Sequence, residues 1–308
     1  MAGLVRVGIS GWRYAPWRGE FYPKGLPQRL ELAYASRALS TIELNGSFYS
    51  LQTPQRYAEW REATPDGFVF SVKAPRFITH VRRLRDFDAP LANFMASGIF
   101  SLQEKLGPIL WQFPPSFTFD PEQLEPFLAA LPHDTDAAGR LAERHDAHLR
   151  GRAQTHSPRK WVMRHAMEIR NYSFVDERFV KLLRKYRVAL VVADTAGRWP
   201  SCQDVTADFM YMRLHGDKEL YASGYTDKAL DDWAQHIDAW RHGRQPRNSP
   251  RISQDAPPAR NTREVFCYFD NDIKVKAPYD AARLAQRLGA AQRLIDHAPI
   301  LDELIPQG

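Results

Sequence analysis

Short apolar runs alternate with segments of helical periodicity along almost the whole chain. The runs predict eight strands, at residues 5–9, 41–45, 68–73, 109–113, 165–170, 188–194, 209–214 and 265–269. Seven predicted helices fill most of the gaps. Six are expected at residues 27–39, 54–63, 121–131, 175–186, 228–240 and 279–288, and one lies within residues 88–105, beginning near Pro90. Thr53 and Asp120 are the expected N-caps of two of these helices, each followed by a proline. This alternation predicts a parallel sheet.

The number of strand–helix units indicates how the sheet closes. Eight units in 308 residues predict one (β/α)8 barrel of eight parallel strands, a TIM barrel, since that fold commonly uses about 250 residues. A doubly wound open sheet is the alternative, although no GxGxxG motif follows the first strand. Two polar stretches, 132–160 and 241–263, interrupt the pattern, and 137–149 can be helical. Neither has enough apolar periodicity for its own core, so we expect two insertions in a single domain, 1–308.

Composition and charge narrow the class of protein only a little. A hydrophobic share of 44% is enough for a large core, and two cysteines, Cys202 and Cys267, are too few for a disulfide framework. No signal peptide and no run of about 18 apolar residues is found, so we expect a cytoplasmic protein without membrane association. The net charge of +6 suggests nucleic acid. However, segment 241–263 alone holds six arginines and one aspartate, so the basic character belongs mostly to one loop.

Polar side chains gather at the carboxyl ends of the predicted strands. They are Glu43, Asn45, Ser71, Lys73, Gln112, Glu168, Arg170, Asp194, Arg213, His215, Asp270 and Asn271. In barrels of this kind the functional groups lie at this end of the strands. The pattern therefore predicts a polar ligand pocket at the C-terminal mouth. The alternative is that these groups form buried ion pairs that only close the barrel.

Aromatic residues follow the first two strands and are expected at the same end. They are Trp12, Tyr14, Trp17, Phe21, Tyr22, Phe48 and Tyr49. Such rings can stack on a sugar or a base, or simply wall the rim, and Trp12 is the one we expect nearest a ligand. His80 also lies close to a strand end. Standard metal and nucleotide motifs are missing, so we expect no metal and no cofactor.

Several of these motifs together resemble one known family. Gly8-Ile9-Ser10-Gly11-Trp12, Glu43-Leu44-Asn45, Phe70-Ser71-Val72-Lys73, Gln112-Phe113-Pro114-Pro115, Glu168-Ile169-Arg170 and Arg213-Leu214-His215-Gly216 are similar to the YecE-like family, domain of unknown function seventy-two. The resemblance runs from about Val5 to Leu288 and implies a TIM barrel of unsettled function. It also implies an architecture like that of xylose-isomerase and endonuclease-four type barrels. The chain departs from the family after the eighth strand, where Asp270-Asn271 replaces an Asn-Asn pair and the following glycine is missing.

Two functions from different classes fit these observations. The first is a protein that binds a small anionic or sugar-phosphate-like ligand, with hydrolase or isomerase chemistry of the acid–base type. Lys73, Arg170 and Arg213 would then hold negative charge. Glu168 or Asp194 would act as general acid or base, with His215 as proton partner. The remaining expected ligand contacts are Trp12, Glu43, Asn45, Tyr49, His80 and Gln112. The alternative is a nucleic-acid-binding or processing protein, and a purely structural role is a third. Catalysis itself and the oligomeric state are not decided by the sequence.

Overall fold

Eight parallel strands close a barrel in the computed structural model, which describes residues 2–290 and 297–304. The strands are β1 Val5–Ser10, β2 Thr41–Leu44, β3 Val69–Lys73, β4 Leu106–Gln112, β5 His165–Glu168, β6 Ala189–Asp194, β7 Phe209–Leu214 and β8 Glu264–Phe269. Each strand pairs with its neighbour in sequence, and β1 pairs in parallel with β8. The predicted (β/α)8 barrel is confirmed, and closure rules out the open doubly wound sheet.

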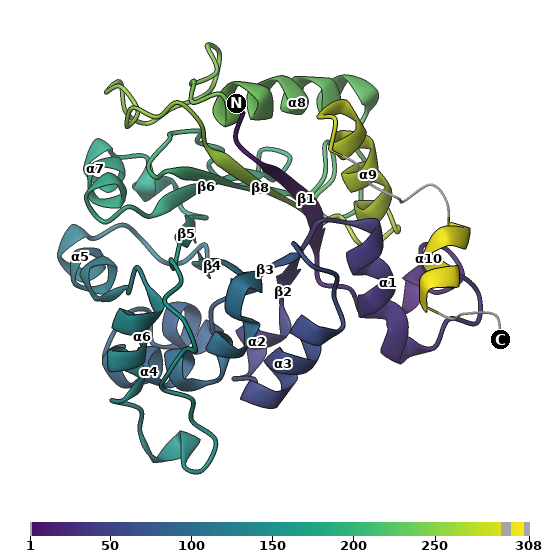
Figure 1. Cartoon of the computed structure of the whole chain (residues 1–308). Coiled ribbons are helices and arrows are strands. Elements are labelled where there is room, and N and C mark those ends of the chain that lie inside the picture. Colours follow the sequence, from purple (N-terminus) through teal and green to yellow (C-terminus); the bar gives the residue numbers. More distant parts are fainter. Residues whose placement is uncertain (1, 291–296, 305–308) are drawn as a thin grey trace.

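Helices surround the strands on the outside (Figure 1). The α-helices are α1 Glu31–Ala38, α2 Gly46–Tyr49, α3 Pro54–Glu62, α4 Asp88–Ala96, α5 Pro121–Ala130, α6 Thr135–Ala142, α7 Glu177–Lys185, α8 Asp227–Arg241, α9 Ala277–Arg287 and α10 His297–Leu304. Short 3-10 helices occupy Ala15–Trp17, Gln28–Leu30, Ile99–Lys105, Ala147–Leu149 and Tyr172–Phe174, and Phe77–Val81 is a π-helix. Within the described residues no helix is both long and apolar enough to cross a membrane.

Local signals correctly located the starts of two helices and did not indicate where a third one ends. Thr53 accepts a hydrogen bond from the Arg56 amide at the start of α3, and Asp120 accepts one from the Glu122 amide at the start of α5. The helix expected within residues 88–105, beginning near Pro90, is α4, which ends at Ala96 and is followed by a 3-10 helix. Gly98 separates the two, with φ at 114° and its α-carbon so close to Pro54 that a β-carbon would lie 2.4 Å from the proline nitrogen. Only glycine fits this turn.

The barrel interior changes from apolar to polar toward the carboxyl ends of the strands. Alternate strand residues point inward, and the inward apolar cluster includes Val69, Leu110, Ala166, Val191, Phe209 and Phe266. Above it lies a layer of hydroxyl groups. In this layer Tyr268 Oη is 2.9 Å from Thr41 Oγ1, and Tyr211 Oη is 2.6 Å from Ser71 Oγ. The charged strand-end residues lie directly above that layer.

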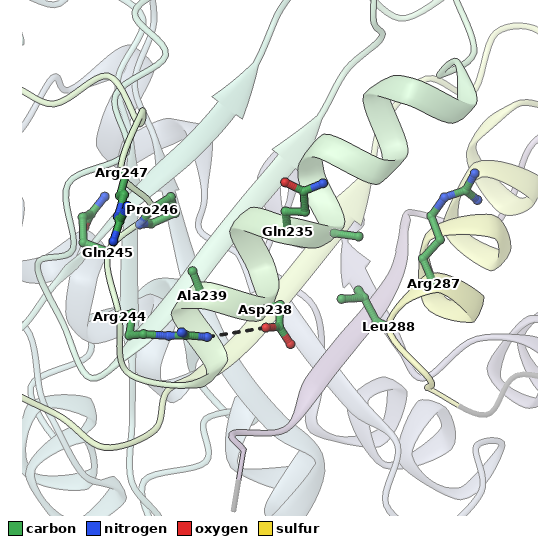
Figure 2. A pocket seen from close by; sticks show the side chains of 10 residues that line it. Gln235, Asp238, Ala239, Arg244, Gln245, Pro246, Arg247, Arg287 and Leu288 are labelled. Carbon is green, nitrogen blue, oxygen red and sulfur yellow. Dashed lines mark ion pairs between the residues drawn. The ribbon is translucent and has the colours of Figure 1, made fainter.

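Both polar insertions join a helix to the strand that follows it, and they lie against different parts of the barrel. Segment 132–160 contributes α6, which lies against α4, and the Gln154 amide donates to Ala96 O at 2.8 Å. Segment 241–263 joins the end of α8 to the start of β8, at the N-terminal ends of the strands. The Gly3 amide donates to Arg241 O there. Figure 2 shows a shallow hollow beside this loop, where Arg244 lies 3.7 Å from Asp238 of α8.

Candidate functional site

One buried arginine organises the charged layer at the barrel mouth. Arg213 Nε and Nη2 donate to the two oxygens of Glu43 at 3.1 and 2.9 Å. Its Nη1 donates to Glu168 Oε2 at 2.7 Å, and Nη2 also donates to Asp270 Oδ2 at 2.8 Å. The side chain is only 1% exposed. The guanidinium is thus already paired with three carboxylates from β2, β5 and the end of β8, so its donors are used within the protein.

The carboxylates of this network are held ionised. Burial alone would raise the pKa of Glu168, but the charges of Arg170, Arg213 and His215 hold that pKa well below its usual range. Arg170 Nε donates to Glu168 Oε1 at 2.6 Å, so both carboxylate oxygens have an arginine partner. The pKa of Asp270 is likewise depressed, against the effect of burial, by Arg213 and His215. Both groups therefore remain negative over the physiological range.

Lys73 differs from the paired charges around it. Its ammonium lies 4.4 Å from the centre of the Phe48 ring, and no hydrogen bond or ion pair reaches it from the described residues. Burial, followed by the charge of Arg213, lowers its pKa to about 8. A partly buried lysine whose ammonium has no direct ion pair with the described residues is a group that can bind an anionic ligand.

The mouth above the network is an open cavity of about 940 Å³. Most of the residues expected in a ligand site line it: Trp12, Asn45, Tyr49, Lys73, His80, Gln112, Arg170 and Arg213. Glu43 and Glu168 are fully buried just beneath it. His215 is also buried, with Nδ1 3.0 Å from Asp270 Oδ2 and Nε2 3.4 Å from Arg213 Nη1. The geometry thus brings together eleven of the twelve expected residues.

Asp194 is the exception, and its expected place at the mouth was wrong. Val191 and Ala193 belong to the inward cluster, so alternation puts Asp194 on the outer face of β6. There its Oδ2 accepts hydrogen bonds from Tyr225 Oη at 3.0 Å and from Trp233 Nε1 at 3.3 Å. Burial raises its pKa. These contacts tie β6 to α8 and keep the carboxylate away from the cavity.

One histidine and one asparagine in the cavity lining can act as neutral hydrogen-bonding groups. Burial and the charges of Lys73 and Arg170 lower the pKa of His80 to about 4, so its ring is neutral at pH 7. Asn45 donates through Nδ2 to Ser10 Oγ at 3.0 Å, while its buried Oδ1 has no partner among the described residues. That oxygen is an acceptor available to a hydroxyl group of a ligand.

Asp272 is a candidate functional residue that strand-end reasoning missed. It lines the cavity from the loop after β8, and its backbone oxygen accepts a hydrogen bond from Trp17 Nε1 at 3.2 Å. Burial and the negative charge of Asp270 raise its pKa to about 6. A carboxyl group with a pKa near neutrality suits proton transfer. Its position three residues beyond the strand was the only available signal, because the direction of a loop side chain does not follow strand alternation.

Further cations that the sequence did not single out complete the rim. Arg13, Arg56 and Arg76 line the cavity, and the described residues offer none of them an ion pair. Together with Lys73 they make four cations that no carboxylate of the described residues pairs with. Asp272 and Glu59 are the acids of the lining that have no cationic partner in this part of the chain. The accessible part of the mouth is thus net positive.

The described residues contain no group of three or more His, Cys, Asp or Glu side chains arranged to hold a metal ion. The absence of a metal or cofactor in the working protein stays a prediction. Elemental analysis of protein purified without added metal addresses it directly.

Comparison with known proteins adds a family. The model of the family described as "Protein of unknown function DUF72" matches residues 6–303. UPF0759 protein YunF of Bacillus subtilis is 32% identical over 119 residues, which cover 37% of this chain and 41% of that protein. UPF0759 protein YecE of Escherichia coli K12 is 30% identical over 132 residues, which cover 42% of this chain and 45% of that protein. The matches thus span less than half the length of these curated relatives.

Solved structures share the fold. A DUF72 family protein from Thermotoga maritima superposes with a TM-score of 0.68 at 24% identity, covering 93% of this chain and 99% of that one. A DUF72 family protein from Enterococcus faecalis gives a TM-score of 0.65 at 17% identity, covering 94% of this chain and 96% of that one. At these identities the similarity establishes the common barrel.

Proposed function

The chain belongs to the DUF72 family of proteins of unknown function, and from that premise we propose that its barrel mouth binds a small anionic ligand of the sugar-phosphate kind. The observation that carries the proposal is a set of four cations around one cavity that have no ion pair with any described residue, Arg13, Arg56, Lys73 and Arg76. Cations held near one another without counter-ions repel, and an anion bound among them relieves that repulsion. Lys73 is central because it is the last residue of β3 and lies on the inward face of that strand.

The sugar part of the ligand is supported by neutral groups of the same cavity. Asn45 Oδ1 is a buried acceptor without a partner, and a ligand hydroxyl can donate to it. Trp12 and Tyr49 add aromatic rings to the lining of the same cavity. Sugars bind in this way, with ring faces on aromatic residues and hydroxyls on fixed polar groups.

In this proposal the charged network positions the site, and proton transfer falls to a different residue. Arg213 and Glu168 satisfy each other and orient Arg170, whose guanidinium lies 4.0 Å from the centre of the Trp199 ring. Glu168 remains ionised and both its oxygens are in use, so it is a positioning residue. Asp272, with its pKa near 6, takes the place of Asp194 as the candidate general acid or base. His215 contacts the carboxylate of Asp270 through Nδ1 and helps to fix its position.

Calorimetric titration with glucose 6-phosphate, and with glucose as the uncharged comparison, tests the binding proposal. We expect the phosphate ester to bind and Lys73→Met to weaken it by about tenfold or more, the effect of losing a charged hydrogen bond. Lys228→Met is the matched control, because Lys228 is exposed on α8 and pairs with Asp232. Equal affinity for glucose and its phosphate, or unchanged affinity in Lys73→Met, would contradict the proposal. Tighter binding of a single-stranded oligonucleotide would favour the nucleic-acid alternative.

A further inference from the structure

A second cavity opens beside the mouth and shares a wall with it. It has a volume of about 750 Å³ and is called here the side groove. Its apolar lining residues are Phe48, Tyr49, Leu51, Pro75, Phe77, Ile78, Ala89 and Pro90. Phe48, Tyr49 and Ser50 line both the side groove and the mouth. One ligand can therefore occupy both cavities without leaving the protein surface.

The side groove exposes aromatic surface that the fold does not cover. Tyr49 is 72% exposed and Phe77 is 46% exposed. Phe48 and Tyr49 meet edge to face, with ring centres 5.1 Å apart. Large exposed apolar side chains gathered in a concave region are typical of a binding site rather than of ordinary surface.

The backbone around the side groove is irregular in a way that also points to function. Phe77 and Ile78 belong to the π-helix Phe77–Val81, a rare element often found at functional sites. The loop after it holds three non-glycine residues in the left-handed region, Arg83, Leu84 and Asp86, with φ of 50°, 60° and 45°. Strain concentrated in one short segment persists when the surrounding structure enforces it, and such segments cluster at ligand sites.

The insertion 132–160 completes the side groove on its far side. Asp146, His148 and Arg152 line it there, and the Asp146 amide donates to Asn93 Oδ1 of α4 at 3.0 Å. This hydrogen bond therefore holds the inserted segment against α4 at the place where it lines the side groove. The chemistry of the combined site follows from its parts: cations in the mouth, aromatic and aliphatic carbon in the side groove, and Phe48 between them with Lys73 Nζ 4.4 Å from its ring centre.

On the basis of the proposed function, we propose that the side groove binds an apolar group of the same ligand whose anionic group is held at the mouth. The ligand class is thus narrowed from sugar-phosphate-like anions in general to those that also carry an aryl or arylalkyl group, an anionic conjugate. The continuity of the two cavities at Phe48 and Tyr49 selects this occupant. A separate apolar partner would not need the shared wall.

Calorimetric titration with inorganic phosphate, phenyl phosphate and 4-phenylbutyl phosphate tests this inference. The wild-type protein should bind 4-phenylbutyl phosphate at least about tenfold more tightly than phosphate, as burial of a phenyl group predicts. Phe77→Ser should remove most of that gain and leave phosphate affinity unchanged, while Phe77→Leu should keep part of it. Val162→Ser is the matched control, since Val162 is 69% exposed and lines neither cavity.

The outcomes separate this inference from the proposed function. If phosphate binds but the arylalkyl group adds no affinity, or if Phe77→Ser retains the gain, the side groove is not the site and the mouth proposal stands. If neither phosphate nor glucose 6-phosphate binds to the wild-type protein, the mouth proposal fails and this inference fails with it.

Discussion

Arg213 illustrates at the residue scale how charge is tolerated inside this barrel. Its guanidinium has hydrogen-bonded carboxylates on every side, Glu43, Glu168 and Asp270, and it is 1% exposed. Burying an ion pair costs desolvation energy that good geometry offsets, but removing one partner leaves the others charged and unpaired. The network is therefore sensitive to loss of its single central cation, far more than a surface ion pair would be.

Replacing Arg213 by methionine should lower the free energy of unfolding by about 3–5 kcal/mol at pH 7. Glu168 and Asp270 have depressed pKa values in the fold, so their stabilising effect exists above their unfolded pKa of about 4 and is lost as pH falls further. The deficit of Arg213→Met in urea denaturation should thus shrink as the pH falls from about 4 toward 2. A deficit that stays constant with pH would mean that lost packing, not lost charge, is responsible. Arg178→Met, on an exposed pair, is the control.

For Asp272 we expect the opposite dependence of stability on pH, because burial and the charge of Asp270 raise its pKa to about 6. Its unfolded pKa is about 4, so the folded protein must ionise an unfavourably placed carboxyl as pH rises from about 4 through 6. Asp272→Asn should therefore raise the Tm above pH 7, and the difference from wild type should fall toward zero near pH 4. Thermal unfolding across this range measures it, with Asp255→Asn in the exposed loop as the control. A pH-independent difference would contradict the raised pKa.

Sequence reasoning succeeded for residues whose direction follows from strand alternation and failed elsewhere. Glu43, Lys73, Glu168 and Arg213 were located correctly because each lies at the end of a strand with a recognisable inward face. Their pairing could not be predicted, because it depends on strands distant in the chain meeting across the barrel. For the same reason the sequence could not show that Arg170 and Arg213 have carboxylate partners while Lys73 has none among the described residues.

At the scale of elements, β6 shows why strand ends alone were insufficient. Both faces of a strand in this fold are buried. Ala189–Asp194 is therefore an almost continuous apolar run, and its sequence does not indicate which residues face inward. A polar residue at its end can then face either the mouth or the helices. Asp194 faces Trp233 of α8, and only the register with β7, which places Ala193 beside Arg213, decides the question.

The elements that build the side groove were equally hidden from the sequence. The π-helix Phe77–Val81 and the four-residue helix α2 are too short to show a periodic pattern. The insertion 132–160 was correctly identified as polar, but its role in lining the groove depends on where it folds back against α4. Short irregular segments thus form much of the side groove, whereas the regular strands and helices form the barrel.

At the scale of the whole molecule, the alternation of strands and helices was enough to predict a parallel sheet, and eight units favoured closure. The pairing of β1 with β8 is the step that the pattern cannot show, since it joins residues more than 250 positions apart. That closure creates the two different ends of the molecule. The cation-lined mouth lies at one end, and the arginine-rich loop 241–263 lies at the other.

This separation gives a prediction for the loop. Arg241 and Arg263 have structural contacts, since Arg241 pairs with Asp238 and Arg263 is 1% exposed. The other arginines, Arg244, Arg247, Arg251 and Arg260, are the ones to replace together by glutamine. Non-specific affinity for an oligonucleotide should drop and lose much of its salt dependence, because phosphate contacts release counter-ions. Affinity of the mouth for glucose 6-phosphate should not change, because no loop residue lines that cavity. Loss of sugar-phosphate binding in this variant would show that the loop reaches the mouth and that the two ends are not independent.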